Sequence, residues 1–150
     1  MLRISKIADY GTKIMLAMAE SPHYRLCAAT ELAESTHISL PTVSKILKLL
    51  LKGDLLISQR GSQGGYQLAR TPEEITLAQI VSVLDGEIAM TECEQQMGCC
   101  QIEDNCNVKG NWAIISNIIV DVLRNISLAQ MSKPIQKDDI PLKFYQRVSA

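Results

Sequence analysis

Apolar residues recur every three or four positions over five stretches of the chain, which is the spacing of amphipathic helices. These stretches cover residues 4–20, 28–35, 40–52, 71–85 and 111–131. The last is the longest uninterrupted one, and it carries apolar side chains on more than one face. The sequence therefore predicts a mainly α-helical protein.

Two shorter runs, residues 55–58 and 66–68, have the pattern of strands and flank a glycine-rich stretch over 59–65. Glycine allows positive φ and a close approach to a DNA backbone, and Arg60 lies in the same stretch. This pattern predicts a small β-hairpin with a basic tip, the wing of a winged helix. The stretch is no nucleotide-phosphate loop, because it lacks the Gly-Lys-Ser/Thr ending and a following helix.

The helices over 28–35 and 40–52 are joined by the short polar turn 36–39, as in a helix-turn-helix. Ser39 is a good N-cap for the second helix, and Pro41 suits its first turn. The alternative is an ordinary helical hairpin with a solvated basic face. The wing predicted directly after it favours a winged helix-turn-helix that binds double-stranded operator DNA.

Short polar and basic side chains near the start of the second helix suit a close approach to the major groove. The residues expected to contact bases there are Ser39, Thr42, Ser44 and Lys45. Arg60 is expected in the minor groove, whose negative potential attracts arginine. The candidates for phosphate contacts are Arg3, Lys6, Lys48 and Ser62.

Charge is divided unevenly along the chain, although the formal net charge is −1. Residues 1–70 carry nine Lys/Arg against five Asp/Glu, a net charge of +4. Residues 71–150 carry six basic and eleven acidic side chains, a net charge of −5. A polyanionic partner is therefore expected for the first half only.

In the helix over 111–131, apolar residues step alternately by three and four positions, which is a heptad-like seam. Few other apolar elements remain to cover both faces of this helix, which disfavours a monomer that buries it. We therefore expect a dimerisation helix and a homodimer. The seam consists of Trp112, Ile115, Ile119, Val122, Ile126 and Ala129, and a second stripe consists of Ile114, Ile118 and Leu123.

Four of the five cysteines lie within residues 93–106, among Glu, Gln, Asn and Gly. Such a polar segment needs disulfides, zinc or an iron–sulfur cluster to order it. No apolar run spans a bilayer and the first residues lack a secretory signal, so we expect a cytoplasmic protein without membrane contact. A reducing cytoplasm disfavours disulfides, and the lack of a Cys-x2-Cys pair disfavours zinc. Cys27 stands apart and is interpreted as a small buried apolar residue.

Several motifs together identify a family. They are Ser5-Lys6-Ile7-Ala8-Asp9-Tyr10 in the first helix, Ile38-Ser39-Leu40, the wing from Arg60 to Tyr66, Leu84-Asp85-Gly86, three spaced cysteines and Trp112. Over residues 1 to about 131 the chain resembles the Rrf2 family of bacterial winged-helix transcription regulators. The resemblance is greatest to regulators of iron–sulfur cluster assembly operons, particularly those of the SUF system. It implies a homodimer with a bound iron–sulfur cluster that alters DNA recognition, with [2Fe–2S] favoured over [4Fe–4S].

The resemblance also implies a set of cluster ligands. Cys93 and Cys106 match the outer two ligands of the family. The middle ligand is either Cys99 or Cys100. Cys100 is favoured, because the remainder of the chain then aligns through Trp112 without a further gap.

The position of the fourth ligand differs from that in part of the family. The position of the family's histidine holds Lys109, whose ammonium cannot ligate iron at neutral pH. One alternative is Asp9 of the partner subunit, in the manner of the nitric-oxide-sensing branch that this chain also resembles. The other is Cys99, which would give an all-cysteine site. Asp9 also suits the first turns of a helix on electrostatic grounds alone.

The predicted function is a DNA-binding repressor controlled by an iron–sulfur cluster in the Cys93–Cys106 loop, acting on cluster-assembly genes. The alternatives are a nitric-oxide or redox sensor of the same family and an iron–sulfur carrier or electron-transfer protein. The sequence shows no Ser/His/Asp or paired-carboxylate arrangement together with signs of a pocket. We therefore expect neither an enzyme nor a small-molecule substrate. The expected organisation is a winged helix with its following helix over 1–86, a cluster loop over 87–110, a dimerisation helix over 111–131 and a loosely held tail over 132–150.

Overall fold

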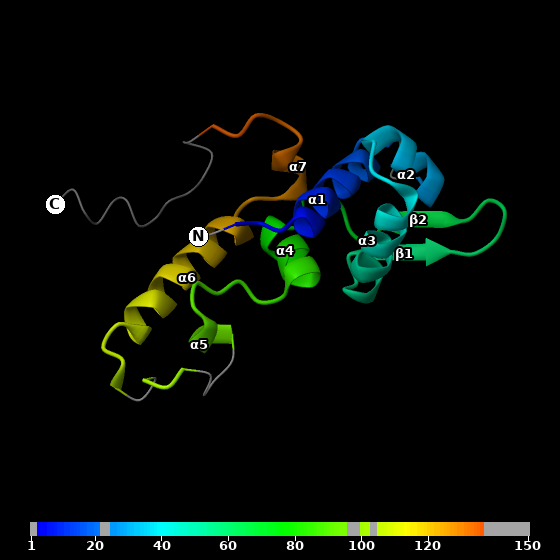
Figure 1. Cartoon of the computed structure of the whole chain (residues 1–150). Helices are drawn as coiled ribbons and strands as arrows, with labels where there is room; N and C mark the ends of the chain where they lie inside the picture. Colours follow the sequence, from blue (N-terminus) through cyan, green and yellow to red (C-terminus); the bar gives the residue numbers. More distant parts are fainter. Residues whose placement is uncertain (1–2, 22–24, 96–99, 103–104, 137–150) are drawn as a thin grey trace.

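The structure is a computed structural model that describes residues 3–21, 25–95, 100–102 and 105–136. Within them the protein is mainly α-helical with an antiparallel hairpin, so the predicted fold class is confirmed (Figure 1). No helix in this part of the chain is long and apolar enough to cross a membrane. The elements are α1 (Lys6–Ala19), α2 (Ala29–Thr36), α3 (Leu40–Lys52), β1 (Leu56–Gln59), β2 (Gly65–Leu68), α4 (Leu77–Asp85), α5 (Glu92–Gln95), α6 (Lys109–Arg124) and α7 (Leu128–Met131).

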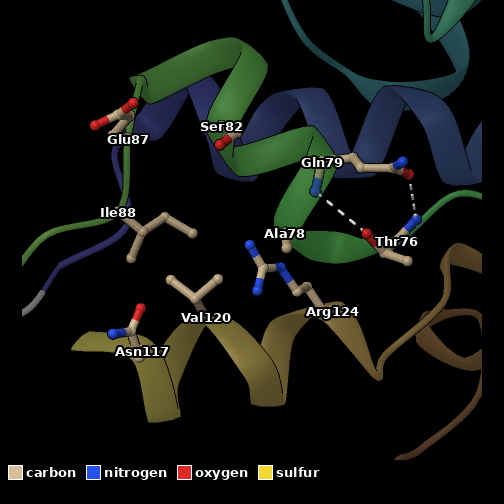
Figure 2. A pocket seen from close by; sticks show the side chains of 9 residues that line it. All are labelled: Thr76, Ala78, Gln79, Ser82, Glu87, Ile88, Asn117, Val120 and Arg124. Carbon is tan, nitrogen blue, oxygen red and sulfur yellow. Dashed lines mark hydrogen bonds between the residues drawn. The ribbon is translucent and has the colours of Figure 1, made fainter. Parts of the chain in front are cut away.

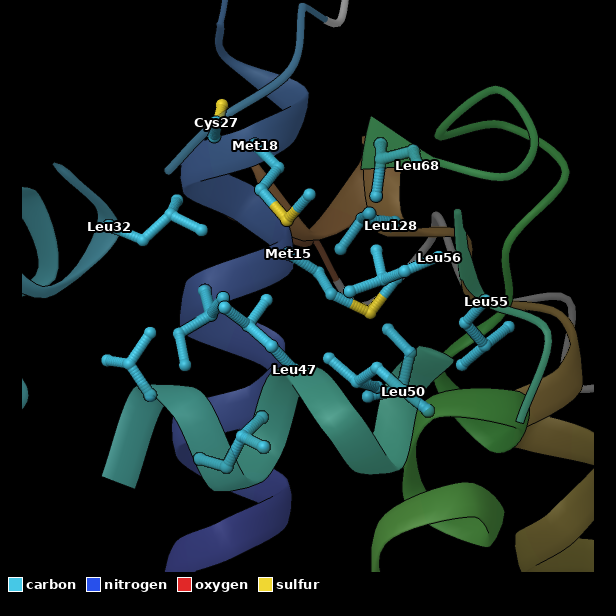
Figure 3. Packing of buried hydrophobic residues seen from close by; sticks show 14 of the residues in the cluster. Met15, Met18, Cys27, Leu32, Leu47, Leu50, Leu55, Leu56, Leu68 and Leu128 are labelled. Atoms are coloured by element: carbon cyan, nitrogen blue, oxygen red, sulfur yellow. The ribbon is translucent and has the colours of Figure 1, made fainter. Parts of the chain in front are cut away.

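Helix α1 lies at the centre of the hydrophobic core and packs against α2, α3, α4 and α7. It shares the core with the buried stripe of α3 (Figure 3). An added Cβ at Gly11 of α1 would lie 2.2 Å from Leu84 Cδ1 of α4, so the two helices cross closely there. This packing fixes the orientation of α3. The buried stripe of α3 consists of Val43, Ile46, Leu47 and Leu50, and α1 contributes Ile14, Met15 and Met18.

Strands β1 and β2 form the predicted hairpin, which pairs Leu56 with Leu68 at its base. Cys27, just before α2, forms a β-bridge to Tyr66 through backbone N–O distances of 2.8 and 2.9 Å. Gly65 permits this approach, because an added Cβ would lie 2.6 Å from the Cys27 carbonyl oxygen. The wing is therefore anchored to the helix-turn-helix. Cys27 itself is buried, as interpreted from the sequence.

Helix α4 begins later than the sequence pattern predicts. Residues 71–74, expected to open the helix, form a separate turn in which the Thr71 N–H donates to the Glu74 carboxylate at 3.0 Å. This bond, together with one from the Thr71 hydroxyl, lowers the pKa of Glu74. The helix starts at Leu77 instead, because Thr76 and Gln79 form a reciprocal capping box there (Figure 2).

The single helix expected over 111–131 is two helices in the structure, α6 and α7. The chain leaves the helix after α6 to pair with the segment before α4, where the Leu77 N–H donates to the Ile126 carbonyl at 2.9 Å. The Leu128 N–H likewise donates to the Ile75 carbonyl at 2.8 Å. Ser127 then opens α7 with a second capping box. Ile126 is therefore buried within its own chain rather than exposed in the predicted seam.

Removal of the Thr76 cap should destabilise the protein measurably. In Thr76→Ala the Gln79 backbone N–H loses its side-chain acceptor, so the free energy of unfolding should fall by about 1 kcal/mol. Chemical denaturation followed by circular dichroism measures this change. Ser82→Ala, at an exposed position of the same helix, should leave stability unchanged or slightly higher, because Ala is the better helix former. An equal loss in both variants would contradict the assigned start of α4.

Candidate functional site

The N-terminal end of α3 presents polar side chains directly after a sharp turn. His37 follows α2 with a left-handed φ of 58°, which redirects the chain toward α3. Ser39 and Lys45 are exposed, whereas Thr42 and Ser44 are half-buried. The hydroxyls of Ser39 and Thr42 lie 2.8 Å apart in a hydrogen bond. All four residues predicted to contact bases are thus brought together at one end of α3.

The wing adds a second exposed element beside α3. The hairpin projects from the helical body in Figure 1, and both Arg60 and Ser62 are exposed. Gly61 between them has a φ of 118°, which L side chains rarely adopt, as expected for a glycine at this tip. Lys48 is exposed on α3, one turn beyond Lys45. The N-terminal end of α3 and the wing are the two elements with which a winged helix contacts DNA.

Arg3 and Lys6 are exposed but lie apart from this group. They flank Ser5, whose N–H donates to the Asp85 carboxylate at the end of α4 at 3.1 Å. Figure 1 shows the start of α1 beside α4 and away from the wing. Phosphate contacts by Arg3 and Lys6 remain a prediction, one that requires DNA to extend to the α4 side of the molecule.

The cysteine loop joins α4 to α6 and contains α5. Cys93 lies in α5, with its Sγ 3.3 Å from Thr91 Oγ1. Cys93, Cys100 and Cys106 are half-buried free thiols, while Cys99 lies outside the described residues. Within the described ranges no three His, Cys, Asp or Glu side chains gather into a metal-binding group. The chemistry of the donors nevertheless fits an iron–sulfur cluster, because such clusters are held by Cys thiolates.

Asp9 lies on the first turn of α1. It lines a cavity of about 310 Å³ together with Leu123 of α6 and Met131 of α7. The cysteine loop contacts α6 at Ser116 through Glu94, and Ser116 is about 10 Å from Leu123 at the helical rise per residue. Within the described residues, Asp9 forms no metal-binding group with the cysteines of its own chain.

The carboxylate of Glu94 ties the cysteine loop to α6. Its Oε2 accepts a hydrogen bond from the Ser116 hydroxyl of α6 at 2.8 Å. It also accepts from the backbone N–H groups of Met90 and Thr91 at 3.0 and 3.2 Å. Partial burial raises the pKa of Glu94, but these hydrogen bonds outweigh it and lower the pKa overall. The sequence prediction missed this contact; the Thr91-x-x-Glu94 spacing of a capping box indicates only the local bonds between Thr91 and Glu94.

Helix α6 is poorly covered within one chain. Among its residues Ser116 alone is buried, whereas Trp112, Ile114 and Ile115 are exposed by 39%, 61% and 40%. On the side facing α4, a groove of about 600 Å³, lined in part by Arg124, separates the two helices (Figure 2). Large apolar side chains exposed over one turn of a helix, as from Trp112 to Ile115, indicate a candidate protein–protein contact.

A helix-turn-helix held on a central helix and followed by a two-stranded wing defines a winged-helix protein of the DNA-binding class. Residues 4–134 match the Rrf2 family, described as "Iron-dependent Transcriptional regulator". The chain belongs to the Rrf2 family of DNA-binding transcriptional regulators. The family predicted from the motifs is thereby confirmed.

Relatives and solved structures agree with this assignment. The HTH-type transcriptional regulator IscR of Pectobacterium carotovorum subsp. carotovorum (strain PC1) is 29% identical over 130 residues, which cover 87% of this chain and 79% of that protein. Protein rrf2 of Nitratidesulfovibrio vulgaris is 25% identical over 132 residues, 88% of each chain. The structure of T. potens IscR aligns with a TM-score of 0.66 and 27% identity, over 99% of this chain and 92% of that chain. The structure of CymR (YrzC), the global cysteine regulator of B. subtilis, aligns with a TM-score of 0.70 and 25% identity, over 91% and 100%.

Arg60 should contribute far more to DNA affinity than an arginine on α6. Arg60→Ala removes an exposed guanidinium from the wing, so affinity should fall by about tenfold or more. The measurement is fluorescence anisotropy with a duplex that the wild-type protein has selected from a random pool. Arg124→Ala removes the same charge from α6 and should leave affinity unchanged. Equal losses in the two variants would indicate that only net charge matters, against the predicted role of the wing.

Proposed function

We propose that this protein is a homodimeric transcriptional repressor whose operator binding is controlled by an iron–sulfur cluster held in the Cys93–Cys106 loop. The proposed target genes are those of iron–sulfur cluster assembly. The observation that carries the proposal is the set of free, half-buried thiols at Cys93, Cys100 and Cys106. They lie on the segment that joins the winged helix to α6, so a group bound to them acts on that junction.

Cys93, Cys100 and Cys106 would supply three thiolates, with Cys99 as the alternative to Cys100 for the middle position. A bound cluster supplies a redox-active centre whose potential depends on its ligands and surroundings. We favour [2Fe–2S] over [4Fe–4S]. The description of the matched family as iron-dependent supports an iron-responsive role for these thiols.

The proposed fourth ligand is Asp9 of the partner subunit, with Cys99 as the alternative. Asp9 is exposed on α1, and among the described residues it forms no metal-binding group with the cysteines of its own chain. A carboxylate in this position is free to serve the loop of a second chain, since a two-fold dimer brings the surfaces of its subunits together. Dimer formation would then be needed to complete the ligand set.

The second chain is proposed to pack on α6. Trp112, Ile114 and Ile115 are exposed in the single chain, and burial of apolar surface is the main favourable term in association. The seam proposed from the sequence is now shorter, because Ile126 is buried in its own chain. The proposed interface is therefore confined to α6 itself.

Control of DNA binding follows from the two points at which the loop is attached. Cys93 lies in α5 and Cys106 lies shortly before α6, so holding both thiols at one centre fixes α5 against the start of α6. The two α6 helices of the dimer would set the spacing of the winged helices, and two half-sites are bound together only at a matching separation. Because coupling between two binding sites is reciprocal, operator DNA should also affect retention of the cluster.

A nitric-oxide or redox sensor of the same family is the second candidate. Asp9 favours it, because the resemblance to the nitric-oxide-sensing branch rests on that position. The same residues would hold the cluster in both cases, and the difference lies in the agent that damages it. Release of operator DNA after exposure of the loaded protein to oxygen or to nitric oxide, one at a time, separates the two candidates.

Anaerobically purified protein should contain iron and acid-labile sulfide. Cys93→Ala and Cys106→Ala should each lose most of the iron, because each removes a thiolate ligand. Cys27→Ala is the control and should retain the iron, since Cys27 is buried beside Tyr66 of β2. Colorimetric iron and sulfide per subunit, with visible absorbance, measure the result. Zinc without sulfide in the wild-type protein would overturn cluster control and leave DNA binding intact.

A charge in the proposed interface should dissociate the dimer. Ile115→Glu places a carboxylate on α6 where apolar contact is proposed, so the protein should elute as a monomer. Size-exclusion chromatography with light scattering measures the mass. Ile57→Glu makes the same change at an exposed position of β1, 51% accessible, and should leave the mass unchanged. A dimeric Ile115→Glu protein would contradict the proposed interface.

A further inference from the structure

The hydroxyl of Ser116 is bonded differently from the other buried hydroxyls in the described part of the chain. Thr12 and Thr36 each donate to the carbonyl four residues earlier in the same helix. That is the usual arrangement of a hydroxyl inside a helix. Ser116, 5% exposed, instead bonds out of α6 to Met90 and Glu94, which are 26 and 22 residues earlier. This bond fixes the position of another segment.

We define the Glu94 network as Met90, Thr91, Glu94 and Ser116. The Ser116 hydroxyl donates to Glu94 Oε2 at 2.8 Å and accepts from the Met90 N–H at 3.1 Å. The same carboxylate oxygen accepts from the N–H groups of Met90 and Thr91 and from the Thr91 hydroxyl, at 3.0, 3.2 and 3.2 Å. Hydrogen bonds to an ionised group are stronger than neutral ones. They therefore hold the start of α5 firmly on α6.

The network reaches the first cysteine of the loop through Thr91. The hydroxyl of Thr91 lies 3.2 Å from Glu94 Oε2 and 3.3 Å from Cys93 Sγ. Cys93 and Glu94 are also neighbours in the single turn of α5. The groups that fix the Glu94 carboxylate thus restrict the position of the Cys93 thiol as well.

At its other end the network reaches the helix that carries the exposed apolar side chains. Ser116 directly follows Ile114 and Ile115 in α6, which are 61% and 40% exposed. The network is therefore a continuous set of hydrogen bonds from the thiol of Cys93 to the helix that carries the proposed dimer surface.

We propose that Glu94 is a positioning residue that transmits the state of the cysteine loop to α6. This inference rests on the proposed function, because it concerns how the proposed cluster site is connected to the dimer helix. With the network intact, α5 and α6 move as one unit. Without it, the thiols still bind their cofactor, but their occupancy no longer changes the position of α6.

Glu94→Gln and Ser116→Ala test the inference directly. Glu94→Gln keeps the size of the side chain but replaces an acceptor-only carboxylate with an amide that also carries two donors. Glu87→Gln, an exposed glutamate on the same connection between α4 and α5, is the matched control for the lost charge. Circular dichroism and the unfolding midpoint establish that each variant is folded.

The decisive measurement is the ratio of operator affinities of the cluster-loaded and the cluster-free protein, both prepared anaerobically. In the wild type this ratio should lie in the range of about 5- to 150-fold that is usual for allosteric coupling. It should approach one in Glu94→Gln and in Ser116→Ala, and it should stay at the wild-type value in Glu87→Gln. The double variant Glu94→Gln/Ser116→Ala should have the same affinity ratio as either single variant, because both changes break the same connection.

A second measurement needs no cofactor. The alkylation rate of Cys93 in the cluster-free protein, followed by peptide mass spectrometry, should rise in Glu94→Gln and in Ser116→Ala but not in Glu87→Gln. The inference is overturned if Glu94→Gln keeps the wild-type affinity ratio, or if loaded and cluster-free forms lose affinity equally. A wild-type protein without iron, or with a ratio of one, would overturn the proposed function instead. In that case the labelling of Cys93 still decides whether the network positions this thiol.

Discussion

Two backbone hydrogen bonds between the segments before α4 and before α7 determine how α6 is attached to the winged helix. The N–H groups of Leu77 and Leu128 donate across this pairing at 2.9 and 2.8 Å. Ile75 and Leu128 are fully buried, so water cannot replace a lost bond at little cost. Each segment also opens a helix with its own capping box. The end of α6 and the starts of α4 and α7 therefore form one rigid junction.

This junction and the Glu94 network support α6 at two separate points. A helix of 16 residues spans about 24 Å, and a sharp kink in it needs a local disruption of its hydrogen bonds. A displacement at the cysteine loop is therefore carried along α6 to the junction, from which α4 leads into the core around α1. A groove of about 600 Å³ lies between α4 and the second half of α6, so the rigid junction and the Glu94 network are two hydrogen-bonded points that position this helix.

Periodicity in the sequence predicts the helices of the winged helix, because each buries one face, as α3 does from Val43 to Leu50. Periodicity predicts the wrong structure after Arg124, because apolar residues continue at helical spacing there while the backbone pairs with the segment before α4. The Ser127-x-x-Gln130 capping box was a readable sign of that break. The bond from Ser116 to Glu94 was not readable, because it joins residues 22 positions apart and exists only once α5 and α6 are docked. The base contacts at α3 stay a prediction, which rests on side-chain chemistry that the sequence displays.

The proposed role of Asp9 would connect the cysteine loop to the dimer interface. If Asp9 of the partner subunit completes the ligand set, cluster binding and dimerisation stabilise each other by mass action. Asp9 is exposed, whereas Gly11, two residues further along α1, faces Ile46 of α3, so Asp9 lies on another side of α1 than that contact. The loop would therefore act on its own winged helix through α6, and Asp9 of the partner subunit would tie that action to dimer formation. Loss of the Glu94 network would break the connection to α6 and leave the proposed ligand set, and with it the dimer, intact.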